Sequence, residues 1–193
     1  MNIIVDYDAG NITSLCNALE KLKTSFQVSD DESVIRKADK VFFPGQGHMA
    51  QARRSLEKKG LIDCIRSLTQ PFLGICVGMQ LLYDWSEEGE TEGLGIVSGK
   101  LMRFSDPDLK VPQMGWNSVT ARNDNPLFRG LNEEYFYFVH SYAAPLGDQS
   151  IAKAEYGGPF TAACQHKNFS GVQFHPEKSG EAGLQLLKNF LAL

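Results

Sequence analysis

The chain has 193 residues, of which 42% are hydrophobic and 22% are charged, and its formal net charge is −4. A chain of this size buries a sizeable core, so we expect residues 1–193 to form one domain without disulfides or metal. The acidic balance, without any basic run, argues against a nucleic-acid or membrane-surface partner. Apolar segments fall short of the roughly 20 residues of a membrane span, and no signal-peptide pattern opens the chain, so we expect a cytoplasmic protein.

The first half of the chain alternates predicted strands with predicted helices. Apolar residues at helical spacing predict a helix capped by Asn11, a second capped by Asp31, and a helical stretch over residues 49–68 that breaks at Gly60. Four short apolar runs predict strands at residues 2–6, 26–28, 40–43 and 72–75. Because strands separated by helices pair in parallel, this half predicts a parallel sheet with helices on both faces.

The second half consists mostly of strand-like segments. Six of them, separated by turn residues, lie at residues 96–104, 111–121, 134–144, 151–156, 161–166 and 170–175. Short strands in direct succession favour antiparallel pairing. A closing amphipathic helix is predicted from Leu184, Leu187, Phe190 and Leu191. The whole chain therefore predicts one α/β domain, a mostly parallel open sheet flanked by helices with an antiparallel extension in the second half.

A cysteine stands between two glycines in the segment Gly74-Ile-Cys-Val-Gly78, directly after a predicted strand. Glycines permit a sharp strand-to-helix turn, an elbow that exposes the sulfur of Cys76 and directs the following backbone N–H groups toward the group it attacks. A structural cysteine buried as a small hydrophobe is the alternative. We expect that alternative for Cys16, Cys64 and Cys164.

The segment Phe174-His-Pro-Glu177 offers a base for this thiol. A nucleophilic cysteine needs a base that makes the thiolate, and the base needs an orienting group. In an extended segment, residues two apart project to the same side, so His175 and Glu177 are expected to face one way. Together with Cys76 they would form a nucleophile, base and orienter. The alternative is a simple turn in which the carboxylate of Glu177 is solvated.

The remaining histidines suit other positions. His48 is predicted to start a helix, and His166 to lie on the surface. His140 ends an aromatic strand, and we expect it to line the pocket rather than to act as the base. The four histidines and four cysteines show no ligand spacing typical of zinc, so neither a metal nor a cofactor is predicted.

A second glycine loop, Pro44-Gly-Gln-Gly47, follows a predicted strand and precedes a helix. It therefore lies at the carboxyl edge of the parallel sheet, where folds of this kind bind ligands. Glycine backbone at this edge can direct N–H donors at a developing oxyanion. Paired with the amide of Val77, the loop predicts an oxyanion hole, although a loop of this kind taken alone is most often just a turn.

Several segments give the chain a family resemblance. Three of them carry the chemistry, namely P-G-Q-G (44–47), G-I-C-V-G-M-Q (74–80) and F-H-P-E (174–177). On these segments the chain resembles the class I glutamine amidotransferases. Within that family, the chain most resembles the glutaminase subunits of imidazole glycerol phosphate synthases. Four further segments carry this resemblance: D-Y-D-A-G-N (6–11), V-P-Q-M-G-W-N (111–117), Y-F-V-H-S-Y (137–142) and G-V-Q-F-H-P-E-K-S-G (171–180).

The resemblance implies that glutamine is hydrolysed to glutamate and ammonia through a thioester on Cys76. His175 would protonate the leaving ammonia, and Glu177 would orient His175. The implied oxyanion hole comprises Val77, Gln46 and Gly47. The implied substrate contacts come from Gly45, Gln80, Glu88, His140, Ser141 and Tyr142, with the carboxylate of Glu88 suited to the ammonium group of glutamine.

The resemblance also implies a partner. In this family a separate (β/α)₈ cyclase subunit takes up the ammonia in histidine biosynthesis, so a heterodimer is expected. Its docking face would include Asn11, Gln113, Met114 and Trp116, although a core position fits Trp116 equally well. Gln113 departs from the histidine that the family often has there, and Asp8 from a glycine. Asp tolerates the left-handed backbone that such a glycine would adopt.

Three other functions remain open on the sequence. A paralogue would feed ammonia to a different synthetase, for instance one that amidates a nucleotide sugar. A catalytically idle scaffold subunit would only stabilise its partner, and the intact set of Cys76, His175 and Glu177 argues against it. A free-standing cysteine hydrolase would turn over without a partner and need not prefer glutamine.

Overall fold

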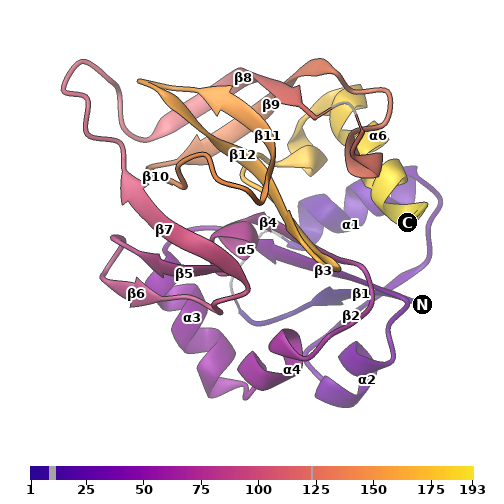
Figure 1. Ribbon diagram of the computed structural model, residues 1–193. Coiled ribbons are helices and arrows are strands. Elements are labelled where there is room, and N and C mark those ends of the chain that lie inside the picture. The colour runs from indigo at the N-terminus through magenta and orange to yellow at the C-terminus, as the bar shows by residue number, and fades with distance from the viewer. Residues whose placement is uncertain (9–11, 123) are drawn as a thin grey trace.

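The computed structural model describes residues 1–8, 12–122 and 124–193, and these form two β-sheets with flanking helices (Figure 1). The larger sheet has nine strands in the order β2-β1-β3-β4-β13-β12-β11-β8-β9. Its parallel half contains β2 (Phe26–Ser29), β1 (Asn2–Val5), β3 (Lys40–Gly45), β4 (Phe72–Cys76) and β13 (Phe169–Val172). Its antiparallel half contains β12 (Pro159–His166), β11 (Ser150–Glu155), β8 (Gln113–Ala121) and β9 (Glu133–His140). The predicted α/β class, with an antiparallel extension, is confirmed.

Helices flank the parallel strands, as the alternation of apolar patterns predicted. Figure 1 shows α2 (Glu32–Arg36), α3 (Met49–Lys58) and α4 (Ile62–Arg66) together on one side, and α1 (Ile12–Lys21) with α6 (Gly180–Leu191) on the other. None of the helices in the described residues is long and apolar enough to cross a membrane.

Local sequence signals explain where several of these elements begin and end. The Asp31 side chain accepts a hydrogen bond from the Ser33 N–H at 2.7 Å and caps α2, as predicted. Gly60, with φ of +68°, separates α3 from α4 and confirms the predicted break. Asp8 has φ of 62°, the left-handed backbone expected in place of a glycine. The predicted cap Asn11 lies outside the described residues.

Strand β13 joins the two halves of the large sheet. It pairs in parallel with β4 on one side and antiparallel with β12 on the other. The carboxyl ends of β3, β4 and β13 therefore meet at one edge of the sheet. This edge holds the loop after Gly45, the turn at Cys76 and the residues that follow Val172.

The second half differs from the prediction at two places. The strand expected at residues 134–144 is two strands, because the chain leaves the large sheet after His140. Its continuation, β10 (Tyr142–Ala143), pairs with β7 (Val97–Arg103) in a separate four-stranded sheet. The strand expected at residues 170–175 ends at Val172, since Pro176 has no backbone N–H for a ladder and instead begins a short 3₁₀ helix, η2 (Pro176–Lys178).

The four-stranded sheet, in the order β10-β7-β5-β6, was only partly anticipated. Strand β7 falls within the predicted segment 96–104. Strands β5 (Tyr83–Ser86) and β6 (Thr91–Glu92) are too short to show the alternation by which strands are predicted. They occupy residues that follow α5 (Val77–Gln80), which is a single helical turn.

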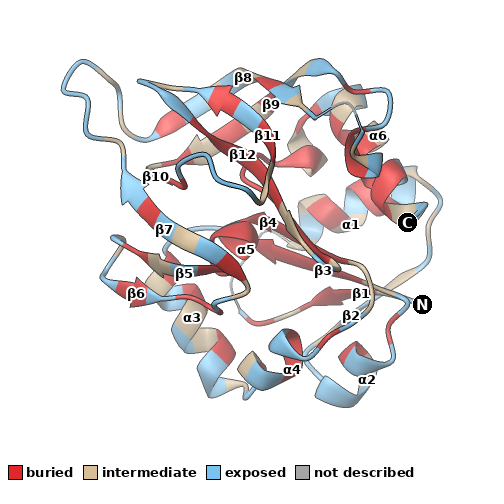
Figure 2. Ribbon diagram, in the orientation of Figure 1, coloured by how far each residue is buried: buried red, intermediate tan, exposed pale blue. Residues whose placement is uncertain are grey.

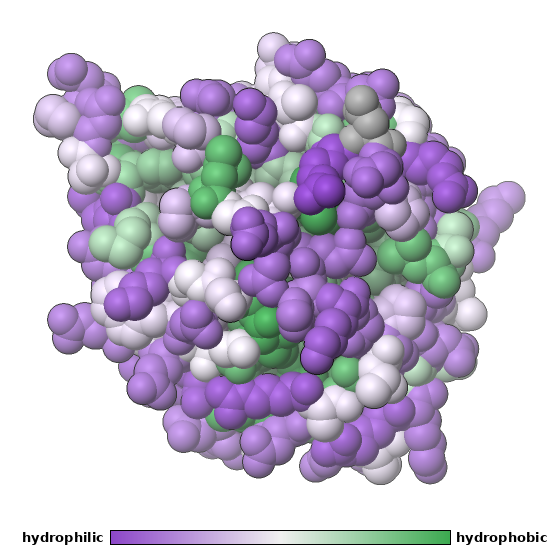
Figure 3. Space-filling model, viewed as in Figure 1, coloured by the Kyte–Doolittle hydropathy of each residue, from purple (hydrophilic) through white to green (hydrophobic). Residues whose placement is uncertain are grey.

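The core lies between the helices and the two sheets, where the central strands are buried along their length (Figure 2). In α6, Leu187 and Phe190 are buried as predicted, while Leu184 and Leu191 pack half-buried against the same core. The surface in Figure 3 is mostly hydrophilic, and its apolar side chains form small separate groups. Of the cysteines expected to be structural, Cys64 and Cys164 are buried and Cys16 is half-buried against the core.

Candidate active site

Cys76 occupies a tight turn between β4 and α5. Its backbone angles, φ 54° and ψ −112°, lie outside the regions that side chains normally favour. The two flanking glycines explain how the turn packs. A Cβ on Gly78 would lie 1.9 Å from the carbonyl oxygen of Phe43, and one on Gly74 would lie 2.6 Å from the carbonyl oxygen of Gly78. The segment 74–78 is thus the strained elbow that its sequence predicted.

His175 and Glu177 lie together, though not in the extended segment that we expected. Nδ1 of His175 is 2.7 Å from Oε1 of Glu177, and both side chains are almost fully buried. The two residues flank Pro176 at the start of η2, and that turn brings them together. The backbone N–H of His175 donates to the carbonyl oxygen of Tyr137 at 2.9 Å, which ties the turn to β9. The expected pairing is correct, while the predicted local geometry is wrong.

The electrostatics of His175 suit a proton donor. Burial lowers the pKa of His175, but hydrogen bonds with Cys76 and Glu177 and the charges of these partners raise it to about 10. The raised pKa therefore favours the imidazolium form of His175 beside Cys76. This form already carries the proton that a leaving amine requires.

This raised pKa makes the stability of the fold depend on pH. The native state holds the His175 proton more tightly than the unfolded chain does, so its stabilisation is complete below the ordinary pKa of 6.5 and disappears as the pH rises to about 10. We expect the free energy of unfolding, measured with urea, to fall between pH 7 and 9.5, by at most a few kcal/mol from this group.

The matched control is Glu177→Gln, which removes one of the partners that raise the pKa. The other groups that titrate in the same window are identical in the two proteins. The variant should therefore lose less stability over this pH range than the wild type. Equal losses in both proteins would contradict the coupling between His175 and Glu177.

A cavity of about 260 Å³ opens over the elbow. It collects most of the predicted site residues, since its walls include Gln46, Gly47, Cys76, Val77, Gln80, Glu88, His140, Ser141, Tyr142 and His175. Glu177 lies behind His175, as an orienting group should. Gly45 lies behind the wall as well, where a Cβ would be 2.6 Å from the Gly78 backbone nitrogen. Gly45 thus has a packing role in the structure, and its contact with the substrate stays a prediction.

Gln173 belongs to the site but was missed in the sequence. It is 1% exposed, its Nε2 lies 3.8 Å from Sγ of Cys76, and its Oε1 accepts from Nε2 of Gln80 at 3.1 Å. The position two residues before His175 in the segment 171–177 was the available signal. Three other residues, Pro112, Val139 and Lys178, also line the cavity without having been predicted.

Glu88 is held at the N-terminus of α3. Its Oε2 accepts from the backbone N–H of Met49 at 2.6 Å and lies 3.9 Å from Nδ1 of His48. His48 is the N-cap of α3, as predicted, and accepts from the Ala50 N–H. The helix terminus thus fixes the carboxylate of Glu88, a residue that lines the cavity.

His140 forms a neutral part of the wall, consistent with the role we expected. Burial and the neighbouring charge of His175 lower its pKa, and despite a hydrogen bond with the Tyr142 carbonyl the pKa is about 4. That carbonyl, 2.8 Å from Nδ1, only accepts, so Nδ1 carries the hydrogen of the neutral ring. Nε2 of His140 must then accept a hydrogen bond. The Gln113 side-chain amide lies 2.8 Å from it, and with this amide rotated by 180° its NH₂ group is the donor.

The predicted docking residues separate into two groups. Met114 is 65% exposed and Trp116 is 56% exposed, so Trp116 is a surface residue and not a core one. Gln113 is buried and bonded to His140, so its side chain does not reach a partner, and that part of the expectation is corrected. Alternation along β8 explains the difference, because neighbouring residues face opposite sides. Asn11 lies outside the described residues.

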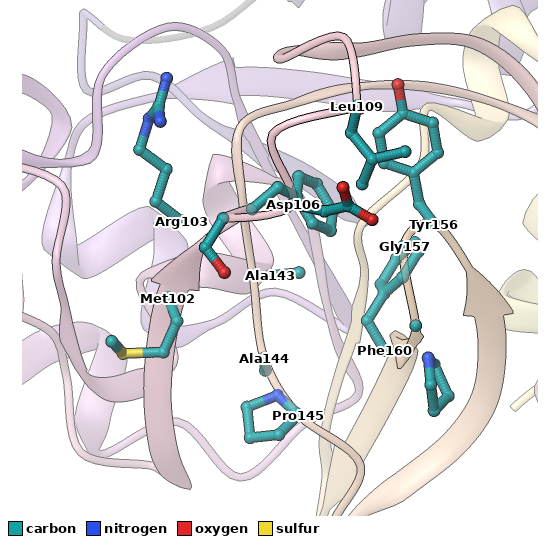
Figure 4. Close-up of a pocket in the computed structure, with 14 residues that line it drawn as sticks. Met102, Arg103, Asp106, Leu109, Ala143, Ala144, Pro145, Tyr156, Gly157 and Phe160 are labelled. Atoms are coloured by element: carbon teal, nitrogen blue, oxygen red, sulfur yellow. The ribbon is translucent and has the colours of Figure 1, made fainter.

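A second cavity, of about 330 Å³, is lined in part by aromatic residues that contact the His140 ring. Its walls come from residues 102–106, 109, 143–145 and 156–160 (Figure 4). Phe104, one of them, contacts His140 with ring centroids 5.1 Å apart. The triad residues lie outside this cavity. Among the described residues, no three His, Cys, Asp or Glu side chains are grouped as a metal site requires.

Comparison with known proteins agrees with this geometry. The model of the family "Glutamine amidotransferase class-I" matches residues 3–193, and the chain belongs to that family. It is accordingly a glutamine amidotransferase. Relatives from Vibrio parahaemolyticus (46% identical, covering 99% of this chain and 97% of the relative) and Yersinia pestis (47%, covering 99% and 98%) are each named imidazole glycerol phosphate synthase subunit HisH.

Solved structures support the fold. PurLQS from Thermotoga maritima superposes with a TM-score of 0.72 at 18% identity, covering 99% of this chain and 97% of that one. The glutaminase domain of CTPS from Trypanosoma brucei gives a TM-score of 0.67 at 16% identity, covering 99% and 93%. At such low identity these likenesses concern the arrangement of strands and helices.

Proposed function

We propose that this chain is the glutaminase subunit of imidazole glycerol phosphate synthase and that it supplies ammonia to a (β/α)₈ cyclase subunit. The observation that carries the proposal is the cluster of Cys76, His175 and Glu177 at one sheet edge, in a chain that matches subunits of this name over nearly its whole length. The proposal places the enzyme in the cytoplasm, without a metal or cofactor.

In the first half of the reaction, the thiolate of Cys76 attacks the side-chain amide carbon of glutamine. Negative charge moves to the amide oxygen, and we assign its stabilisation to backbone N–H groups at Val77, Gln46 and Gly47. When the tetrahedral intermediate collapses, the C–N bond breaks and His175 gives its proton to the leaving ammonia. A glutamyl thioester remains on Cys76, and His175 is left neutral.

In the second half, neutral His175 takes a proton from a water molecule as that water attacks the thioester carbon. The C–S bond then breaks, and glutamate leaves. The Cys76 thiolate and the His175 imidazolium are restored. Glu177 holds Nδ1–H of His175 throughout, at 2.7 Å, so that Nε2 faces the reacting atoms in both steps.

Substrate selection follows from the cavity wall. We assign the ammonium group of glutamine to Glu88, whose carboxylate the N-terminus of α3 holds in place. Gln80, Ser141 and Tyr142 line the same cavity and offer hydrogen bonds for the rest of the amino acid. A substrate without the α-ammonium group would leave Glu88 unpaired and is expected to react poorly.

The docking face of the cyclase is assigned to the exposed side of β8 and β9. Met114, Trp116 and Tyr135 are large, apolar and more than half exposed there. Trp116 packs edge-on against Tyr137, with ring centroids 6.1 Å apart, so the two rings form one continuous aromatic surface. Exposed aromatic and methionine side chains of this kind are enriched in the cores of interfaces.

Glutamate release from glutamine tests the proposal in three conditions: the isolated chain, the chain with the cyclase subunit, and the chain with the cyclase subunit and its ribulose-phosphate ligand. Strong stimulation by the cyclase and its ligand together is the expected result. Equal rates in all three conditions would favour a different ammonia acceptor or a free-standing hydrolase, and a lack of glutamate under every condition would favour the scaffold.

A further inference from the structure

The side chain of Tyr7 lies beneath the proposed oxyanion loop, defined here as residues 44–47. Tyr7 lies two residues after the end of β1 and is fully buried. Its hydroxyl donates to the carbonyl oxygen of Pro44 at 2.7 Å, and its ring stacks on Phe43 with centroids 4.7 Å apart. Both contacts are with the end of β3, the strand from which the oxyanion loop leaves the sheet.

The Tyr7 hydroxyl also lies close to the contact between the oxyanion loop and the elbow, at Gly45. A Cβ on Gly45 would lie 2.7 Å from the Tyr7 hydroxyl oxygen, 2.6 Å from the Gly78 nitrogen and 2.8 Å from Cβ of Val77. Gly45 pairs directly with Cys76 in the parallel ladder of β3 and β4. The loop, the elbow and the hydroxyl therefore pack against one another without spare volume.

We propose that Tyr7 is a positioning residue, whose hydroxyl fixes the oxyanion loop against the elbow that carries Cys76. Proline has no N–H, so the Pro44 segment depends on its carbonyl for a hydrogen bond on this side. With that bond made, the peptides that follow point their donors at one position of the substrate oxygen. The inference rests on the oxyanion donors proposed above.

The hydroxyl is available for this bond at every working pH. Burial raises the pKa of Tyr7 far above its ordinary value, and the charge of Cys76 raises it further. The group therefore remains a neutral O–H donor while charge develops and disappears a short distance away. A buried carbonyl deprived of its donor is left unsatisfied, which favours displacement of the loop.

The test is Tyr7→Phe, with Tyr83→Phe as a matched control. Tyr83 is also buried, and its hydroxyl bonds with Cys164 and Thr161, away from the active-site cavity. For Tyr7→Phe we expect kcat of glutamine hydrolysis to fall at least about tenfold, with KM within about twofold of wild type. Removal of one oxyanion donor lowers kcat by a factor of about 10²–10³, and partial misplacement of a donor lowers it less. Tyr83→Phe should retain the wild-type kcat.

Alkylation of Cys76 by iodoacetamide, followed by mass spectrometry, separates positioning from general damage. This reaction displaces iodide from a saturated carbon and forms no oxyanion. Its rate should stay within about twofold of wild type in Tyr7→Phe, since thiol access and pairing are intact. A wild-type kcat in Tyr7→Phe, an equal loss in Tyr83→Phe, or a parallel loss of alkylation would each overturn the proposal. Activity in Cys76→Ala would instead overturn the active-site assignment.

Discussion

Replacing Cys76 by alanine is expected to reduce glutamine-dependent synthesis by the complex at least about a thousandfold, because the thioester cannot form. Synthesis with added ammonium salts should persist, since it bypasses this subunit. The contacts of the thiol to the Val139 carbonyl oxygen and to Nε2 of Gln173 are long, each at 3.8 Å, and His175 keeps its hydrogen bond to Glu177 when the thiol is removed, so we expect the fold to stay intact. The measurement is product formation with each nitrogen source.

Cys64→Ala is the matched control for this prediction. Cys64 is as well buried as Cys76 but lies in α4, outside the cavity wall. The Cys64→Ala variant should lose some stability and retain glutamine-dependent synthesis. Full glutamine-dependent activity in Cys76→Ala would refute the assigned nucleophile. Loss of the ammonia-dependent reaction would show that the substitution damages the complex itself.

Gly78→Ala is expected to have the largest effect on stability of any single methyl group added to the elbow. The new Cβ would lie 1.9 Å from the Phe43 carbonyl oxygen and 3.3 Å from the Phe43 ring. The obstacle at the shorter distance is backbone, which cannot rotate away, so either β3 or α5 must move. We expect a loss of about 3 kcal/mol or more, which in a chain of this size lowers Tm by roughly 10 °C.

Gly147→Ala provides the comparison, because a Cβ there meets nothing within 4 Å and the backbone has an ordinary φ. Thermal unfolding of both variants, with glutaminase assays on each, gives the readout. The control should stay within about 0.5 kcal/mol of wild type. If Gly78→Ala unfolded at the same temperature as the control, the close approach of elbow and β3 would be wrong.

The parallel half of the fold was predictable because each of its signals is local. Short apolar runs alternate with segments of helical periodicity, and this alternation indicates βα units. The side chain of Asp31 caps the start of a helix, and the positive φ of Gly60 ends one. The same holds for the elbow, since a turn with glycines at residues 74 and 78 permits few conformations. The two glycines and the family segments were sufficient to predict the strained turn at Cys76, the residue we propose as nucleophile.

The site residues that sequence failed to indicate depend on long-range contacts. Gln173 is a polar residue after a short buried strand, and only the approach of Gln80 and Cys76 from other strands gives it a partner. The burial of Gln113 depends on its pairing with His140 across β8 and β9. Such pairings join segments far apart in the chain, so local pattern carries no trace of them.

The pairing of His175 with Glu177 was predicted by an argument whose geometry proved wrong. We expected an extended segment, in which alternation places both side chains on one side. The structure instead has a short 3₁₀ helix that begins at Pro176, and this helix also brings the two side chains together. The residue types, a base and a carboxylate two positions apart, decided the outcome. The backbone between them was determined by proline, whose missing N–H ends the ladder of β13.

The insertion of β13 between β4 and β12 has a consequence for how the enzyme is made. Cys76 leaves the ribosome early, whereas His175 and Glu177, its proposed base and orienting group, follow most of the second half of the chain. A nascent chain therefore displays an unassisted thiol, and the triad closes only when the last strand enters the sheet. Strands β8 and β9 have been synthesised by then. On the proposed mechanism, glutamine hydrolysis therefore requires a chain in which β8 and β9, and with them the exposed aromatic surface, have already been made.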